Sequence, residues 1–317
     1  MKSKKSTFYF LLIGGRGNQL FIINAALGLL KKNPNLAINL FPFCTSVNLG
    51  VKEIIDSFKM ENNRLLIEEG LFGKPAGALT RKLISAALRS SSKKSIAYRI
   101  CLQIIQNCLM LALSFRSGNL VRVFVSKDLG FGGFPSMKKN TFVIGYFQSA
   151  KYGLNFQVDK KYSGPIQSKK QQGSVRVMMH VRLGDYRENP NFGILSPTYY
   201  KRILDCIVLD SPSVKLDIYT NGSAMEIAEY VSIVSDISEL KVFAAEDLNE
   251  SESFDKMTGG YDYYLIANSS FSFWAARLGE NRIATVYYPE PWFLKQGSPS
   301  DLCPLEWIPQ PARFVSG

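Results

Sequence analysis

The second half of this 317-residue chain alternates two hydrophobic patterns that differ in period. Short apolar runs, typical of buried strands, occupy residues 175–181, 214–220, 240–244, 263–267 and 282–288. Apolar residues at helical spacing occupy 196–209, 224–234, 254–259 and 271–278, and Ser196 and Pro197 suit the start of the first of these helices. Strands and helices that alternate with short connections predict an α/β fold, a doubly wound parallel sheet.

The first half of the chain begins with the same alternation. Strand patterns cover residues 7–13, 36–41 and 141–147, helical spacing covers 20–30, and 49–67 has a mixed helical pattern. A basic and mostly helical stretch fills 71–120. Residues 160–173 are rich in Lys, Gln and Ser without apolar periodicity, which is typical of a linker. We therefore predict two domains, residues 1–170 and 171–317.

Polar side chains gather at the end of the strand predicted at 175–181. Alternation along the strand places His180 and Arg182 on one face, Gly184 permits a tight turn, and Asp185 follows it. Open α/β sheets bind ligands at this end of their strands. His180 is the only histidine, which excludes a multi-histidine metal site. The same residues also fit a purely structural role, in which Arg182 and Asp185 form an ion pair.

Two turns between strand and helix carry small or polar residues. Residues 14–19 (GGRGNQ) lack the third glycine of a dinucleotide fingerprint and are not a P-loop. Residues 268–271 (NSSF) could present N–H groups and hydroxyls to a phosphate, or only cap the next helix. Together with Arg182, this second turn would suit a diphosphate. The chain has no Asp-x-Asp triplet, so arginine and backbone donors would neutralise that group in place of a metal.

Charge is distributed unevenly between the two halves. Residues 1–172 hold 26 Lys or Arg and 7 Asp or Glu, against 12 and 19 in residues 173–317. The imbalance is strongest over 73–139, with 12 basic residues and one acidic residue. Nucleic acid is one partner for such a surface, but no zinc-finger or RNP-type motif accompanies the charge. A surface of anionic lipid headgroups fits better.

The segment 96–115 comes nearest to a membrane span. Polar residues interrupt it at spacings of three and four and form a stripe on an otherwise apolar helix: Arg99, Gln103, Gln106 and Asn107. Such a stripe is unusual in the middle of a spanning helix. Two alternatives remain open, a helix buried in the first domain and a helix that lies at a membrane interface.

The cysteines and the N-terminus both point to the cytoplasm. The five cysteines, at positions 44, 101, 108, 206 and 303, are odd in number and form no CxxC pair. Most lie in apolar surroundings, which predicts reduced core residues. The apolar run at 8–13 is too short for a secretion signal.

Six short motifs, in order along the chain, resemble those of the α-1,2-fucosyltransferases of glycosyltransferase family 11. They are GGRGNQLF at 14–21, GYFQSAKY at 145–152, HVRLGDY at 180–186, LSPTYY at 195–200, IANSSFSFW at 266–274 and PEPWF at 289–293. The ordered set spans nearly the whole chain. The basic stretch at 73–139 has no counterpart that can be matched.

The resemblance implies a GT-B-like fold, in which two Rossmann-like domains face a cleft and 73–139 is a helical insertion in the first. It implies an inverting, metal-independent transfer of L-fucose from GDP-β-L-fucose to the 2-hydroxyl of a galactoside. Arg182 matches the arginine that contacts the donor diphosphate, with His180 and Asp185 as its companions. The remaining donor-binding positions match residues of two turns: Asn268, Ser269, Ser270 and Phe271, and Gly17, Asn18 and Gln19 facing the donor sugar.

Two positions depart from the family pattern. Leu183 stands where a second arginine is common, and Phe273 stands where a tryptophan is common. The general base is open, because Asp185 is the nearest carboxylate but could instead orient its neighbours. Three alternatives for function are a non-catalytic nucleotide-sugar-binding protein, a transferase with a different donor or linkage, and a basic nucleic-acid-binding protein.

Overall fold

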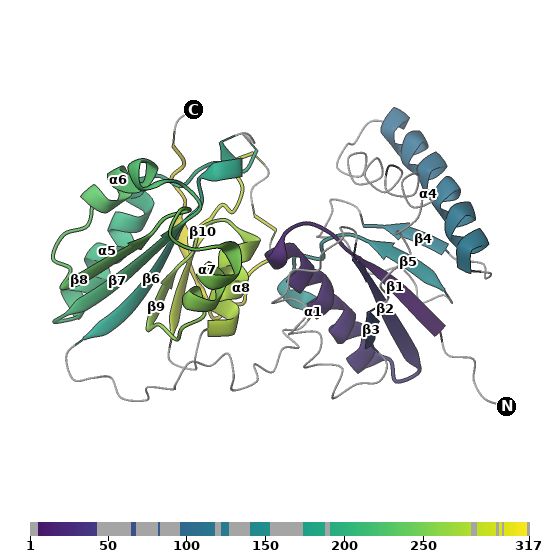
Figure 1. Ribbon diagram of the computed structural model, residues 1–317, viewed down its shortest axis with the longest axis horizontal. Coiled ribbons are helices and arrows are strands. Elements are labelled where there is room, and N and C mark those ends of the chain that lie inside the picture. The colour runs from purple at the N-terminus through teal and green to yellow at the C-terminus, as the bar shows by residue number, and fades with distance from the viewer. Residues whose placement is uncertain are drawn as a thin grey trace. The chain divides into compact units, whose positions relative to one another are not determined.

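The computed structural model describes residues 6–42, 65–67, 82, 96–117, 122–126, 140–152, 174–187, 191–279, 284–295, 298–299 and 301–315. The chain forms two compact units, Met1–Phe156 and Gln157–Gly317, and each is an α/β sheet with parallel strands (Figure 1). This confirms the predicted fold class. The predicted boundary at residue 170 and the linker 160–173 lie outside the described residues.

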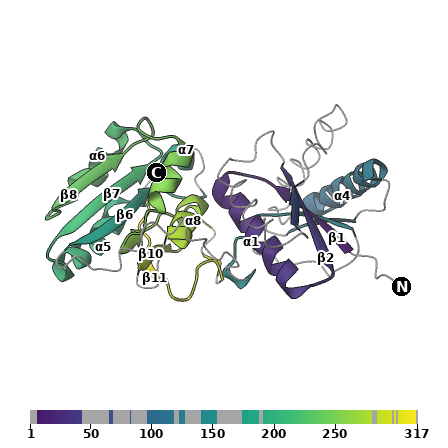
Figure 2. The same cartoon turned by 60° about the horizontal axis from the view of Figure 1, so that its bottom comes forward.

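The first unit is built on a parallel sheet whose described strands have the order β3–β2–β1–β5–β4. Their bounds are β1 Ser6–Leu12, β2 Leu36–Pro42, β3 Leu65–Ile67, β4 Arg122–Val125 and β5 Thr141–Ile144. Helix α1 (Arg16–Lys32) packs on β1 and β2 (Figure 2), and α4 (Ile96–Ser117) lies beside β4 (Figure 1). A short 3-10 turn, η2 (Ala150–Tyr152), follows β5.

Two features of this sheet differ from the sequence prediction. Residues 65–67, assigned to a mixed helical segment, are strand β3, because they pair with β2 from Ile38↔Leu65 to Leu40↔Ile67. The stretch 73–139 contains β4, which pairs with β5 and is therefore part of the sheet. Its helix α4 is present as predicted. No described helix is both long and apolar enough to cross a membrane.

The second unit is built on a parallel sheet with the described order β11–β10–β9–β6–β7–β8. Its strands are β6 Val175–Val181, β7 Val214–Thr220, β8 Glu239–Phe243, β9 Tyr263–Leu265, β10 Thr285–Glu290 and β11 Ile308–Pro311. Its helices are α5 Pro197–Asp210, α6 Ala224–Ser232, α7 Glu250–Met257 and α8 Ser270–Gly279. The edge strand β11, Ile-Pro-Gln-Pro, has no counterpart among the predicted strands.

Helices cover both faces of this second sheet (Figure 1). On one face, α5 and α6 bury an apolar cluster that includes Val177 and Met179 of β6 and Ile203 of α5. On the other face, α7 and α8 pack together, and the ring of Phe271 approaches that of His180. From Val177 onward β6 is buried on both faces, and its sequence there is apolar apart from His180, as is typical of central parallel strands.

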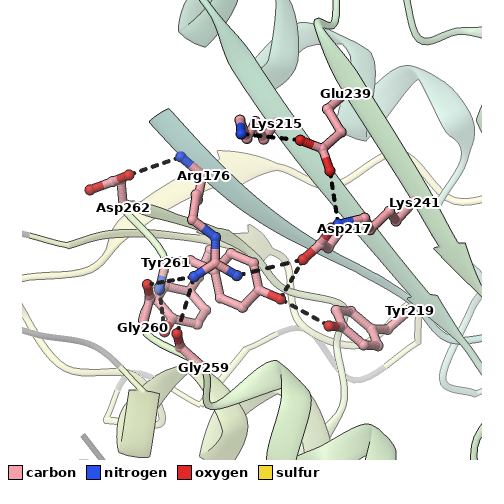
Figure 3. Close-up of polar contacts among 11 residues, drawn as sticks. Arg176, Lys215, Asp217, Tyr219, Glu239, Lys241, Gly259, Gly260, Tyr261 and Asp262 are labelled. Atoms are coloured by element: carbon pink, nitrogen blue, oxygen red, sulfur yellow. Dashed lines mark hydrogen bonds and ion pairs between the residues drawn. The ribbon is translucent and has the colours of Figure 1, made fainter. Parts of the chain in front are cut away.

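A polar network anchors the loop between α7 and β9 to the start of β6 (Figure 3). The guanidinium of Arg176 lies 4.5 Å from the centre of the Tyr261 ring and donates to the carbonyl oxygens of Gly259 and Gly260. The backbone N–H of Arg176 donates to the carboxylate of Asp262 at 2.8 Å. These contacts align β9 beside β6.

The same network continues to β7 through a buried hydroxyl pair. Tyr261 donates to the carboxylate of Asp217 at 2.8 Å, and its oxygen lies 2.9 Å from that of Tyr219. Arg176 completes the network with an ion pair to Asp217 at 3.7 Å. Burial raises the pKa of both tyrosines, so both hydroxyls stay protonated.

The prediction that the cysteines are core residues is wrong for two of them. Cys108 and Cys206 are exposed and Cys303 is intermediate, and all three are free thiols. In α5, Cys206 precedes the buried Ile207, and at this spacing it lies on the side of the helix that faces solvent. Apolar neighbours in sequence therefore did not indicate burial.

Candidate functional site

The order of the strands in the second sheet reverses between β6 and β9. From β6 the chain builds outward through β7 and β8, and then returns to place β9 and β10 on the other side. The carboxyl ends of β6 and β9 therefore flank a topological switch point, where α/β sheets form their ligand crevice. The predicted turns at Arg182 and Asn268 follow these two strands.

The residues after β6 form a compact turn, η3 (Gly184–Tyr186), that holds the side chain of Arg182; we call residues 182–186 the arginine turn. One terminal nitrogen of Arg182 lies 2.8 Å from the carboxylate of Asp185. The guanidinium lies 5.6 Å from the centre of the Tyr186 ring. Its Nε is buried and has no hydrogen-bond partner among the described residues. Part of this cation is therefore uncommitted.

His180 lies at the end of β6 and is 3% exposed. Burial, and then the positive charge of Arg182, lower its pKa from 6.5 to about 3, so the imidazole is neutral near pH 7. Its ring lies 5.9 Å from that of Phe271, and its Nδ1 has no hydrogen-bond partner within the described part of the chain. A buried polar atom of this kind is normally satisfied.

The turn before α8 carries the second set of predicted residues. Asn268 is buried and its amide donates to the backbone oxygens of Phe192 and Gly193 at 3.0 and 3.1 Å. The hydroxyl of Ser269 accepts from the N–H of Phe271 at 3.2 Å, so Ser269 caps the helix, and Ser270 is its first residue. The N-terminal N–H groups and the helix dipole make this end favourable for an anion.

A tyrosine joins these two turns. The hydroxyl of Tyr186 donates to the backbone oxygen of Asn268 at 2.7 Å. Its ring also packs against Phe192 at 4.9 Å between centres. The structure thus brings together Arg182, Asp185 and His180 with the 268–271 turn, at one edge of one sheet. The sequence analysis did not assign a role to Tyr186, although it lies within the HVRLGDY motif.

The sequence analysis also missed Asn221, which follows β7. Its Oδ1 accepts from the backbone N–H of Leu183 at 2.8 Å, and its Nδ2 lies 3.4 Å from the Asp185 carboxylate. The available signal was an Asn-Gly pair directly after a strand that neighbours β6. Such a pair is normally interpreted as a turn.

The residues expected to face the donor sugar lie in the first unit, at the start of α1. The predicted loop at 14–19 is shorter than expected, because α1 begins at Arg16 and includes Gly17, Asn18 and Gln19. The side chain of Gln19 donates to the backbone oxygen of Gly14, and Gln148 donates to Asn18 at 2.6 Å. That Gly17, Asn18 and Gln19 face a donor sugar bound at Arg182 stays a prediction.

The described residues were predicted to form no metal site. Within the described ranges, no three His, Cys, Asp or Glu side chains gather in a way that could hold a metal ion. The single histidine of the site is too buried to reach an ion in solvent. Metal independence stays a prediction.

Some known proteins are similar to this chain in sequence or in shape. No family model matches the sequence. An α-1,2-colitosyltransferase of Escherichia coli is 26% identical over 198 residues, which are 55% of this chain. The match spans 63% of that relative's length.

Two solved structures are similar in shape over most of the chain. A glycosyl transferase family 9 protein of Veillonella parvula covers 98% of this chain and 86% of its own, with a TM-score of 0.46 and 10% identity. The ADP-heptose LPS heptosyltransferase II of E. coli covers 98% and 91%, with a TM-score of 0.46 and 13% identity. Both TM-scores are below 0.5, so neither likeness indicates a function for this chain.

Proposed function

We propose that this chain is an inverting glycosyltransferase that moves L-fucose from GDP-β-L-fucose to the 2-hydroxyl of a galactoside in a glycan. One observation carries the proposal. The guanidinium of Arg182, which is only partly engaged by Asp185, and the N-terminal turn of α8 lie at the switch point of one parallel sheet, where Tyr186 joins them. This arrangement offers a cation and backbone donors to a diphosphate.

The sequence match supports sugar transfer, and it also suggests a second candidate for the donor sugar. The relative is named a colitosyltransferase. Colitose differs from fucose by the loss of one hydroxyl, so the same diphosphate site would serve GDP-colitose. Discrimination between the two donors then depends on groups that contact the sugar.

In the proposed reaction, an acceptor hydroxyl attacks the anomeric carbon opposite to the leaving GDP. Negative charge develops on the diphosphate as the bond breaks, and preorganised donors are most effective at such a position. Arg182 and the N–H groups at the start of α8 would supply them. The imidazole of His180 is neutral and buried, so it adds no positive charge at this position.

We assign Asp185 the role of orienting Arg182. Its carboxylate already accepts from Arg182 at 2.8 Å and lies 3.4 Å from the Asn221 amide, and both contacts are to the same oxygen, Oδ1. An oxocarbenium-like transition state places little demand on a base, so the acceptor hydroxyl can lose its proton to water or to the departing diphosphate after the new bond has begun to form.

Turnover with a panel of donors and acceptors tests the function. The chain is incubated with GDP-fucose, GDP-colitose or UDP-galactose and a set of galactosides, with and without EDTA, and the products are analysed by mass and linkage. We expect α-1,2-linked product from a GDP donor, unaffected by EDTA. Hydrolysis without transfer, or no turnover with any donor, would contradict the proposal.

Arg182 variants test the site within that assay. Arg182→Ala should lower kcat/KM by at least roughly 30-fold, which corresponds to about 2 kcal/mol of lost charge-assisted contact. Lys201→Ala is the matched control, because Lys201 has an ion pair of the same length, 2.8 Å, with Asp205 on the surface of α5. Near wild-type activity of Arg182→Ala would remove Arg182 from the mechanism.

We further propose that the first unit binds anionic lipid on the inner face of the membrane. On α4, the side chains of Ile100, Ile104 and Leu111 are 57%, 57% and 67% exposed. Their spacing places them on one face of the helix, opposite the buried Leu109. The surrounding sequence, 73–139, carries the 12 basic residues noted above. An exposed apolar stripe within a basic sequence suits an interface of acidic headgroups.

Vesicle sedimentation tests this surface. Binding should require anionic lipid, weaken with salt, and fall when Ile100, Ile104 and Leu111 are all changed to Ser. The control changes Leu209 and Met225 to Ser, since these are even more exposed, at 85% each, but lie in the second unit. Equal loss in both variants, or binding to neutral vesicles only, would contradict the proposal.

A further inference from the structure

Asn221 lies at the end of β7, directly beside the arginine turn. We infer that Asn221 is a positioning residue, which holds the guanidinium of Arg182 in the orientation that a diphosphate requires. The inference rests on the proposed function, because it assigns a role in the same site. It does not depend on which sugar is transferred or on the acceptor.

The side-chain amide of Asn221 makes two contacts with the arginine turn. Its Oδ1 accepts from the N–H of Leu183 at 2.8 Å, and its Nδ2 lies 3.4 Å from Oδ1 of Asp185. The same carboxylate oxygen accepts from Arg182 at 2.8 Å. Asn221 therefore fixes the backbone on the C-terminal side of Arg182 and also the carboxylate that orients its guanidinium.

Strand register explains why this residue is in reach. β6 and β7 pair in parallel up to Val181↔Thr220, so the next positions on the two strands are Arg182 and Asn221. At that point the ladder ends, and the N–H of Leu183 would lose its partner. The Asn221 side chain replaces the missing backbone acceptor, which matters because Leu183 is only 2% exposed.

Glycine at two positions leaves room for this arrangement. A Cβ on Gly184 would lie 2.3 Å from Nδ2 of Asn221, so the amide can lie against the turn only because residue 184 has no side chain. A Cβ on Gly222 would lie 2.7 Å from Cδ1 of Leu183. The side chain of Leu183 is thus packed in the apolar cluster, and its backbone contacts Asn221.

A double-mutant cycle with GDP as the probe tests the inference. GDP affinity is measured by calorimetry for the wild type, Asn221→Ala, Arg182→Ala and the double variant. We expect Asn221→Ala to weaken GDP binding roughly tenfold, since it removes a hydrogen bond and loosens a second group. If Asn221 acts through Arg182, the double variant should bind GDP as weakly as Arg182→Ala alone.

A conservative variant separates positioning from folding. Asn221→Asp keeps an acceptor for the Leu183 N–H but replaces the amide donor by a charge that repels Asp185. It should keep a near wild-type melting temperature and still bind GDP weakly. Full recovery of GDP affinity in Asn221→Asp would show that Asn221 only supports the backbone, and would overturn the inference.

Asn249→Ala is the control for general damage to the second unit. Asn249 also accepts from backbone N–H groups, those of Ser251 and Glu252 at 3.0 Å, but caps α7. It should lower the melting temperature without a specific loss of GDP affinity. An equal loss of GDP affinity in Asn249→Ala would overturn the inference.

The outcomes distinguish the two proposals. A wild type that binds no GDP overturns the proposed function and the role of Asn221 with it. GDP binding that is lost in Arg182→Ala, but is unchanged in Asn221→Ala, overturns the inference alone. The inference also fails if Asn221→Ala weakens GDP binding equally with and without Arg182.

Discussion

Gly184→Ala should displace the amide of Asn221, because the new Cβ would lie 2.3 Å from Nδ2. The atom that must move is the end of a flexible side chain, so the steric cost itself is small. The main cost is the hydrogen bond to the N–H of Leu183, which is left buried and unsatisfied. Such a group costs about 1–3 kcal/mol.

The expected size of the effect follows from the size of the unit. For a unit of this length, 1 kcal/mol corresponds to roughly 2–4 °C, so the melting temperature of the second unit should fall by roughly 2–12 °C. Thermal unfolding followed by circular dichroism measures the shift. GDP affinity should fall in parallel, because the arginine turn is no longer held.

The double variant Gly184→Ala with Asn221→Ala provides the decisive comparison. Asn221→Ala removes both the hydrogen bond and the atom with which the new Cβ would collide. The two changes should therefore cost about as much together as Asn221→Ala alone. If the two losses of stability add, the contact between residues 184 and 221 does not explain either, and the reasoning is refuted.

Three further predictions concern other parts of the chain. Burial and Arg182 lower the pKa of His180 from 6.5 to about 3 on folding, so the free energy of unfolding should fall as the pH drops from about 6.5 toward 3. Titration of the single histidine NMR signal near pH 6.5 would contradict this. Tyr186→Phe should cost about 0.5–1.5 kcal/mol of stability through the lost hydroxyl bond, whereas Tyr186→Leu, which also removes the ring beside the arginine, should further weaken GDP binding in the calorimetric assay. Gly145→Ala would place a Cβ 2.6 Å from that of Ser126, and should destabilise the first unit in urea unfolding by about 1–3 kcal/mol. The control is Gly15→Ala, whose Cβ meets nothing within 4 Å and which should cost less stability. A larger loss of stability in Gly15→Ala than in Gly145→Ala would contradict the packing argument.

Hydrophobic periodicity predicted the second sheet well because its central strands are buried on both faces. Met178 and Met179 are adjacent and both fully buried, which requires an uninterrupted apolar run. Edge and short strands leave a weaker pattern. β11 contains two prolines, which are tolerated at a sheet edge but oppose a strand assignment. β3 has three residues, too few for a period to show.

The site could be predicted only as far as it is local in sequence. The motif around Arg182 and the turn before α8 each showed polar residues at the end of a strand. Both lie at the carboxyl ends of β6 and β9, where the topology predicts a ligand site. Asn221 could not be found in this way, because its role depends on the register between β6 and β7. The start of α1 was missed because glycines at 14, 15 and 17 indicate a loop, yet the helix begins directly after Gly15.

The network that joins Arg176 to the loop before β9 has a consequence for the order of folding. The strands β6 and β7 are neighbours in the chain and can pair early, whereas the contact from Arg176 to Asp262 spans 86 residues. The carboxyl ends of β6 and β9 therefore cannot lie side by side until that late, long-range pairing is complete. A nascent chain would assemble the proposed diphosphate site only after most of the second unit had emerged from the ribosome. If the proposed site binds GDP, the bound nucleotide would therefore slow unfolding without accelerating folding.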